Sequence, residues 1–410
     1  MTFELQAMTD SGRNMVSLAE AHAEDFVLRA GQHDQDRTVA FENFEAIKTS
    51  GLSGCAAPVE LGGAGMSSMH DWMVCMNRLG RGDGSTALAF NMHMNRTLGL
   101  TRAWQASRVT GNEAREIRSA ELLKRITSGD LIIAVANAEP GADIRTSSTE
   151  AKKTAGGWIL NGRKTFATGS PAAGALSIRF KYTNDSGEDR MGAAIVPTDR
   201  DGMDIKGNWN GMGMRGSGSH DVVLADYFVK DEELDDIGEY GRFNAPMLSV
   251  ASGSNLGLAA IFLGIAEFAH RTIVDSIKNK GHARHPMSQF RVAENEVDLA
   301  TCIAMLDYSG RNVDEFYREF SAAAPTNDIA LLQLKDTQST KLVVNKKAVD
   351  VVDRCMALSG GAGYLESNVI SRLYRDVRAG PLMQPFAANK AYEFIGLVAL
   401  GLDPSEEMIF

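Results

Sequence analysis

The chain has 410 residues, of which 44% are hydrophobic and 23% are charged, and its formal net charge is −10. This length requires more than one core, so we expect two or three domains, and the composition excludes a disordered or fibrous chain. The acidic balance argues against nucleic acid as the main partner.

The sequence shows no sign of export or of membrane insertion. No basic segment followed by an apolar run opens the chain, and the richest apolar stretch, Leu256–Ala269, is interrupted by two glycines. The cysteines lack metal-ligand spacing, so we expect buried thiols rather than disulfides or a metal site. They are Cys55, Cys75, Cys302 and Cys355. We therefore expect a cytoplasmic protein with no membrane partner and no metal.

The first part of the chain, residues 1–130, has the pattern of a helical domain. Apolar residues recur at spacings of three and four, as on the buried face of a helix. The predicted helices are Met15–Ala30, Phe41–Thr49, Asp71–Leu79 and Ser85–Gly99. His93 lies on the last of them, where it is either a core histidine with satisfied ring nitrogens or a catalytic group that faces a ligand.

Residues 131–238 have the pattern of a β domain. The apolar run Ile132–Ala136 predicts a buried strand, which ends at Glu139-Pro140-Gly141 because proline cannot donate a ladder hydrogen bond. Asn161-Gly162 lies between two strand-like segments and predicts a tight hairpin turn. Alternating segments at Leu176–Tyr182 and Ala193–Val196 predict further strands. Together they indicate a β-barrel or a sandwich.

Residues 239–410 return to helical periodicity. The predicted helices are Met247–Asn279, Phe290–Ala322, Ile329–Ala357 and Lys390–Leu402. Long helices joined by short connections indicate an antiparallel bundle. The predicted fold is therefore α+β and multidomain, with an N-terminal helical domain (1–130), a middle β domain (131–238) and a C-terminal four-helix bundle (239–410).

Three motifs are spaced along the chain. The first is the Glu139-Pro140-Gly141 turn with the segment 157–168 after it, the second is GMRGSGSHDV at Gly213–Val222, and the third is Ser359–Tyr364 followed by Arg372–Asp376. Together they resemble the acyl-CoA dehydrogenase family over nearly the whole chain. The resemblance implies that family's fold and an FAD-dependent oxidoreductase. In the family the third motif contacts the FAD of a neighbouring subunit, so the resemblance also implies a homodimer or homotetramer.

The resemblance assigns residues from two regions to the FAD site. Asn137 and Ala138 would lie along the flavin ring. Phe166 would stack near the ring, and Thr168 would reach its polar edge. The phosphates and the neighbouring subunit's cofactor would be contacted by Arg284, Gln289, Gly360 and Gly361. The loop that carries Arg284 is short and departs from the family's spacing at this point.

The residue expected to remove the substrate α proton is absent from both positions that the family uses. By resemblance the first position is Gln384, after Tyr374, and the second is Met247 on the long helix. Neither side chain accepts a proton near neutral pH, whereas a catalytic base must do so. The nearby candidates that could take part in chemistry are His93 and His220.

Three functions are consistent with the resemblance. The first is FAD-dependent α,β-dehydrogenation of an acyl thioester, with Gln384 in place of the usual Glu and an electron-acceptor flavoprotein as partner. The alternative is a flavin-dependent monooxygenase of the same fold, which acts on another small molecule with O2 and reduced flavin from a flavin reductase. In that case His93 or His220 would hydrogen-bond the reacting oxygen. The third is a non-catalytic structural homologue.

Overall fold

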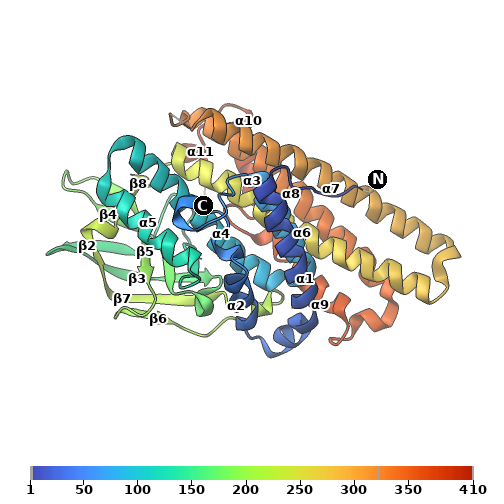
Figure 1. The fold of residues 1–410 in the computed structure, drawn as a ribbon. Coiled ribbons are helices and arrows are strands. Elements are labelled where there is room, and N and C mark those ends of the chain that lie inside the picture. The colour runs from blue at the N-terminus through green and yellow to red at the C-terminus, as the bar shows by residue number, and fades with distance from the viewer. Residues whose placement is uncertain (1–2, 322, 409–410) are drawn as a thin grey trace.

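The computed structural model describes residues 3–321 and 323–408 and has three parts (Figure 1). Helices α1–α5 come first, then the strands β1–β8, then helices α6–α11. Figure 1 shows the sheet on one side of the molecule and the long C-terminal helices on the other. Helix α4 lies between them, because it packs against both β1 and α6. The predicted fold class is confirmed.

The four predicted N-terminal helices are present, although α1, α3 and α4 are longer than expected, and α5 was not among the predicted helices. Their bounds are α1 Asp10–Asp36, α2 Phe41–Thr49, α3 Met69–Gly82, α4 Gly84–Thr110 and α5 Glu113–Thr127. The Asp83 carboxylate caps α4 by accepting hydrogen bonds from the Ser85 and Thr86 amides. Gly111 in the left-handed conformation then ends α4.

One sheet of eight strands forms the middle of the chain. Its strands are β1 Ile133–Ala136, β2 Glu150–Thr154, β3 Gly157–Ala167, β4 Ala175–Thr183, β5 Asp189–Pro197, β6 Met203–Ile205, β7 His220–Lys230 and β8 Asp235–Glu239. Their order is β6-β7-β3-β2-β4-β5-β8, and β1 pairs parallel to the first half of β4. Inward-facing apolar side chains from strands across the sheet meet in one cluster, which shows that the sheet curls around its own core.

The predicted hairpin at Asn161-Gly162 is wrong. Strand β3 runs through both residues, and the hairpin turn lies earlier, at Ala155-Gly156 between β2 and β3. Asn161-Gly162 instead forms a bulge in the pairing of β3 with β7. A Cβ at Gly162 would lie 2.3 Å from the Thr149 hydroxyl oxygen, so glycine is needed there for close packing rather than for a turn.

The C-terminal part contains the four predicted helices and adds shorter ones. The bounds are α6 Ala245–Asn279, α7 Pro286–Glu319, α8 Asn327–Ser359, α9 Val369–Val377, α10 Ala388–Ala399 and α11 Pro404–Glu407. Ala322, the predicted end of the second helix, lies outside the described residues. The predicted boundaries at 130 and 238 fall in the connection before β1 and inside β8.

Helix α6 corrects one expectation from the sequence. By length and hydropathy it could cross a membrane, whereas we expected no stretch of that kind. However, 78% of its most apolar window is buried inside the protein. The helix packs against α3 and α8, which accounts for its apolar character as that of a core helix.

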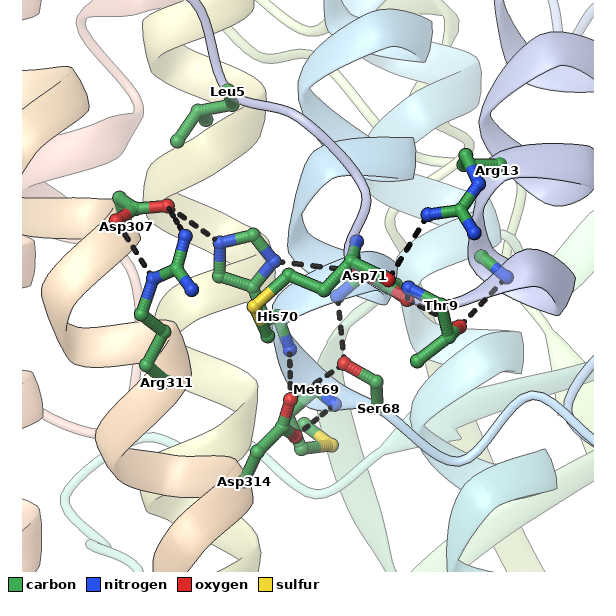
Figure 2. Close-up of polar contacts among 12 residues, drawn as sticks. Leu5, Thr9, Arg13, Ser68, Met69, His70, Asp71, Asp307, Arg311 and Asp314 are labelled. Carbon is green, nitrogen blue, oxygen red and sulfur yellow. Dashed lines mark hydrogen bonds and ion pairs between the residues drawn. The ribbon is translucent and has the colours of Figure 1, made fainter.

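A buried polar cluster joins α3 to α7, and Figure 2 shows it in close-up. The ring of His70 is fully buried, with Nε2 2.9 Å from Asp307 and Nδ1 3.4 Å from Asp71. Asp314 accepts hydrogen bonds from the Ser68 hydroxyl and the Met69 amide at the start of α3. Burial disfavours the charged ring, but the two carboxylates outweigh it and raise the pKa of His70. The cluster fixes the N-terminal helices to the bundle.

Candidate functional site

The fold brings four of the predicted ring-site residues together at the ends of β1 and β3. Val135 bridges Thr168, and Ala138 bridges Thr165 just beyond β1. The Thr165 amide donates to the Ala138 carbonyl at 2.8 Å. Asn137 and Ala138 therefore lie beside the segment that carries Phe166 and Thr168. Their contact with a flavin stays a prediction.

The exposed face of this turn is aromatic and strained. Phe166 has a φ of 52°, which is costly for a residue other than glycine, and its side chain is 61% exposed. Its ring packs edge-on against Trp209 at 6.0 Å between centroids. The side-chain oxygen of Asn137 is buried without a hydrogen-bond donor. An exposed aromatic ring beside an unpaired acceptor fits a flat heteroaromatic ligand that carries N–H groups, such as a flavin ring.

A buried ion pair between Glu139 and Lys164 supports the turn that follows β1. Glu139 and Lys164 are fully buried and in contact. Glu139 also accepts hydrogen bonds from the Ser147 hydroxyl at 2.8 Å and the Thr149 hydroxyl at 2.6 Å. Burial alone would raise the pKa of Glu139, but Lys164 and the hydroxyl donors lower it to about 2. Glu139 is thus ionised, and it ties the turn after β1 to the loop before β2 and to β3.

The two histidines singled out in the sequence differ in position. His93 is fully buried, with Nε2 3.0 Å from the Ser53 carbonyl and Nδ1 accepting the Ile133 amide at 3.1 Å. Burial lowers the pKa of His93 to about 4, and both ring nitrogens are engaged, as expected of a core histidine. His220 accepts the Trp209 amide at 2.8 Å and so supports the residue that packs against Phe166.

No carboxylate occupies either expected base position. Gln384 is exposed and follows η8 (Gly380–Leu382), whereas Met247 is buried in α6. The Gln384 segment is held by α8, because the Lys341 ammonium donates to the Met383 and Gln384 carbonyls at 2.6 and 2.8 Å. Lys341 has no carboxylate partner, and burial lowers its pKa to about 7.

The predicted phosphate-site residues lie away from the ring turn. Helix α6 begins just after β8 and has 35 residues, so its far end lies about 52 Å from the start. Arg284 and Gln289 are exposed beyond that end, and the Gln289 amide donates to the Ala283 carbonyl. Gly360 and Gly361 are exposed after α8, which runs in the same direction as α6 because α7 reverses the chain. Within one chain, the ring-turn residues and the residues at the far end of the bundle therefore do not contact the same cofactor. The homo-oligomer that would bring them together stays a prediction.

Three arginines near the ring turn were missed in the sequence. Arg96 donates to the Ser177 hydroxyl of β4 at 3.4 Å, and Ser177 is paired with Val135 of β1. Arg179 lies two residues further along β4, on the same side of the strand. Arg102 covers the ring of Tyr317 at 3.6 Å. For Arg96 and Arg102 the available signal was their position among buried residues of one helix, and for Arg179 it was an arginine inside an alternating strand.

Comparisons with known proteins identify the family. Three family models match in order: acyl-CoA dehydrogenase N-terminal domain (9–102), middle domain (133–227) and C-terminal domain (256–384). The chain is 30% identical over 397 residues to L-evernosamine nitrososynthase of Micromonospora sp., covering 97% of this chain and 92% of that protein. It is 30% identical to the amino sugar nitrososynthase DnmZ of Streptomyces peucetius over 399 residues, covering 96% and 94%.

A solved structure is similar to this chain over nearly its whole length. KijD3, in complex with FMN and a dTDP-linked 3-amino-4-keto sugar, has a TM-score of 0.90 and 28% identity, covering 99% of this chain and 98% of that one. The relatives are enzymes, and the solved relative binds a flavin, so the non-catalytic alternative is set aside. The chain therefore belongs to the acyl-CoA dehydrogenase family of flavoenzymes.

Proposed function

We propose that this enzyme oxidises the amino group of a nucleotide-linked amino sugar, using reduced flavin and O2, and does not dehydrogenate an acyl thioester. The observation that carries the proposal is the lack of a carboxylate at both expected base positions, Gln384 and Met247. Oxidation of an amine needs no base at a substrate α carbon, whereas thioester dehydrogenation does. The amino sugar nitrososynthases to which the chain is similar support the same choice.

The reaction balances without an acid or base from those positions. An amine, O2, two electrons and two protons give a hydroxylamine and water. A second such oxidation of the hydroxylamine gives a nitroso group and two further molecules of water. When bound, the reduced flavin supplies the electrons to O2. The proposed partner that reduces the flavin is a separate flavin reductase in the cytoplasm.

The chain's own residues would hold the flavin and position the substrate. The Ala138 backbone and the unpaired oxygen of Asn137 would receive the polar edge of the ring, and Phe166 would cover a flat face. The hydroxyl of Thr168 lies 2.9 Å from the Ser219 hydroxyl, so its orientation is set before a ligand binds. Gln384, an exposed neutral amide, would hydrogen-bond the substrate without removing a proton.

We propose FMN rather than FAD as the working cofactor. FAD would need the residues of the far bundle end from a second subunit, and there Gln289 already donates to the Ala283 carbonyl within its own turn. The solved relative was crystallised with FMN. Titration of the flavin-free protein with each cofactor, followed by fluorescence quenching, should show tighter binding of FMN. Tighter binding of FAD would contradict this choice.

The test of the reaction uses two substrate classes in parallel. With FMN, a flavin reductase, reduced nicotinamide and air, a thymidine-diphosphate-linked 3-amino sugar should yield an oxygenated amine by mass spectrometry. Under anaerobic conditions, a panel of acyl-CoA thioesters should leave the oxidised flavin spectrum unchanged. Bleaching of the flavin by a thioester, with no oxidation of the amino sugar, would favour the dehydrogenase instead.

A further inference from the structure

One face of α4 is partly exposed along its length. Most residues of α4 before Leu100 are buried, but partly exposed positions recur at spacings of three and four and so share one side of the helix. We call this side the α4 face; its residues are Met92, Asn95, Arg96, Gly99, Arg102 and Ala103. A Cβ at Gly99 would meet no atom within 4 Å, which shows open space against the helix there.

The α4 face spans from the sheet to the helical bundle. At one end Arg96 reaches Ser177 of β4, which is in register with the strand leading to Asn137. At the other end Arg102 lies over Tyr317 of α7, and the Tyr317 hydroxyl donates to the Ser249 carbonyl of α6. The α4 face therefore extends from the strands next to the ring turn to helices α6 and α7.

Arginines without a carboxylate gather at this face. In the described parts of the chain, every other arginine that is buried or half-buried has a carboxylate within ion-pair distance. The exceptions are Arg96, Arg102 and Arg179. Two of them belong to the α4 face, and Arg179 follows Ser177 on the side of β4 that Arg96 contacts. Among the buried and half-buried arginines of the described residues, those that lack a carboxylate partner are therefore confined to this one region.

The arrangement costs stability when no anion is bound. Burial, followed by repulsion from Arg179, lowers the pKa of Arg96 to about 10, and its Nε is buried without an acceptor. Burial also lowers the pKa of Arg179 to about 10. The carboxylates that act on Arg179, Asp143 and Glu139, are already in contact with Arg145 and Lys164. Buried charges in proteins are normally paired, so a negative partner is missing here.

We propose that Arg96, Arg179 and Arg102 bind the diphosphate of the nucleotide-linked substrate, which lies along the α4 face with its sugar toward the ring turn. Guanidinium groups bind phosphates through paired N–H donors. Arg96 and Arg102 are about 9 Å apart along the helix axis, a spacing that suits an extended anion better than a single carboxylate. This inference rests on the proposed function for its choice of substrate.

Calorimetry on the FMN-loaded enzyme tests the assignment, with thymidine diphosphate as the probe at fixed salt. Arg96→Gln and Arg179→Gln should each weaken binding of the probe at least tenfold. Arg125→Gln, at an exposed arginine without a carboxylate partner, should bind within twofold of the unaltered enzyme. Equal binding by all variants, or no binding by the unaltered enzyme, would overturn the proposal.

Two further measurements distinguish a diphosphate site from a structural role and from a site for a different anion. Without the probe, the melting temperature of Arg96→Gln should stay the same or rise, because an uncompensated charge is removed. A lower melting temperature with unchanged affinity for thymidine diphosphate would mean that Arg96 is structural and would overturn the proposal. Loss of FMN affinity in place of probe affinity would assign the site to the flavin phosphate, and arginine-dependent binding of coenzyme A but not of thymidine diphosphate would assign it to a thioester. Either result overturns the proposal.

The proposed function is judged separately. Oxidation of the amino sugar by a protein whose arginine variants bind the probe normally would leave the function standing and remove this inference. Arginine-dependent binding of the probe without amine oxidation would support the anion site and remove the function.

Discussion

Removal of the Lys164 ammonium should destabilise the enzyme and release its flavin. In Lys164→Met, Glu139 would remain fully buried, with hydroxyl donors but no positive partner. Breaking a buried pair from one side costs about 3–5 kcal/mol, which corresponds to a fall in melting temperature of roughly 4–6 °C for a protein of this size. The flavin affinity should fall as well, because Glu139 holds the turn that carries Asn137 and Ala138.

Removing Glu139, alone and together with Lys164, separates the cost of an unpaired buried charge from the value of the pair. Glu139→Gln leaves the Lys164 ammonium with the Ser147 hydroxyl and a backbone carbonyl, and it should also be strongly destabilising. The double variant carries no unpaired charge, so its cost should be well below the sum of the two single costs. Thermal unfolding with and without FMN, and flavin fluorescence, measure both effects.

An exposed ion pair on the same sheet provides the control. Lys206 and Asp204 are 43% and 60% exposed, and Lys206→Met should change stability by less than about 1 kcal/mol. If Lys164→Met melts within about 2 °C of the unaltered enzyme and keeps its flavin, the pair does not support the turn and the reasoning is wrong.

Three other predictions concern separate parts of the molecule. The pKa of His70 is raised in the folded protein, so the stabilisation that its charged ring gives the fold is complete below pH 6.5 and is lost as the pH rises through the raised pKa. The melting temperature should therefore fall more steeply with rising pH than in His70→Gln. Parallel profiles of the two proteins would contradict this. Gln384→Glu should leave acyl-CoA thioesters unable to bleach the flavin anaerobically, because the missing base is not the only departure from a dehydrogenase; bleaching would contradict this. Gly213→Ala places a Cβ 2.2 Å from the Arg375 carbonyl and should cost about 1–3 kcal/mol. Gly396→Ala has open space around it inside α10 and should stabilise the protein by up to about 1 kcal/mol in the same melting assay.

The fold was predictable where periodicity is long and regular. Helix α6 and its two long partners were expected within a few residues of their observed ends, because apolar residues repeat over many turns. The hairpin at Asn161-Gly162 was not predictable, since a bulge uses the same residue types as a turn. Only the packing of Gly162 against Thr149 distinguishes them, and that contact depends on the strand order.

The candidate site was predictable in part, by motif rather than by geometry. The gathering of Asn137 and Phe166 follows from the pairing of β1 and β3 segments, which no local pattern reveals. The partners of His93 come from η1 (Leu52–Gly54) and β1, so its buried state could only be guessed. Arg96 and Arg179 lie in different domains, and their lack of carboxylate partners is a property of the packed structure alone.

The origin of the oxygen in the product tests the central claim most directly. The enzyme would be supplied with FMN, a flavin reductase, reduced nicotinamide and a thymidine-diphosphate-linked 3-amino sugar under isotopically labelled O2, and the product analysed by mass spectrometry. We expect the nitrogen of the sugar to carry oxygen derived from O2. An unlabelled amino sugar recovered unchanged, together with anaerobic reduction of the bound flavin by an acyl-CoA thioester, would contradict the account.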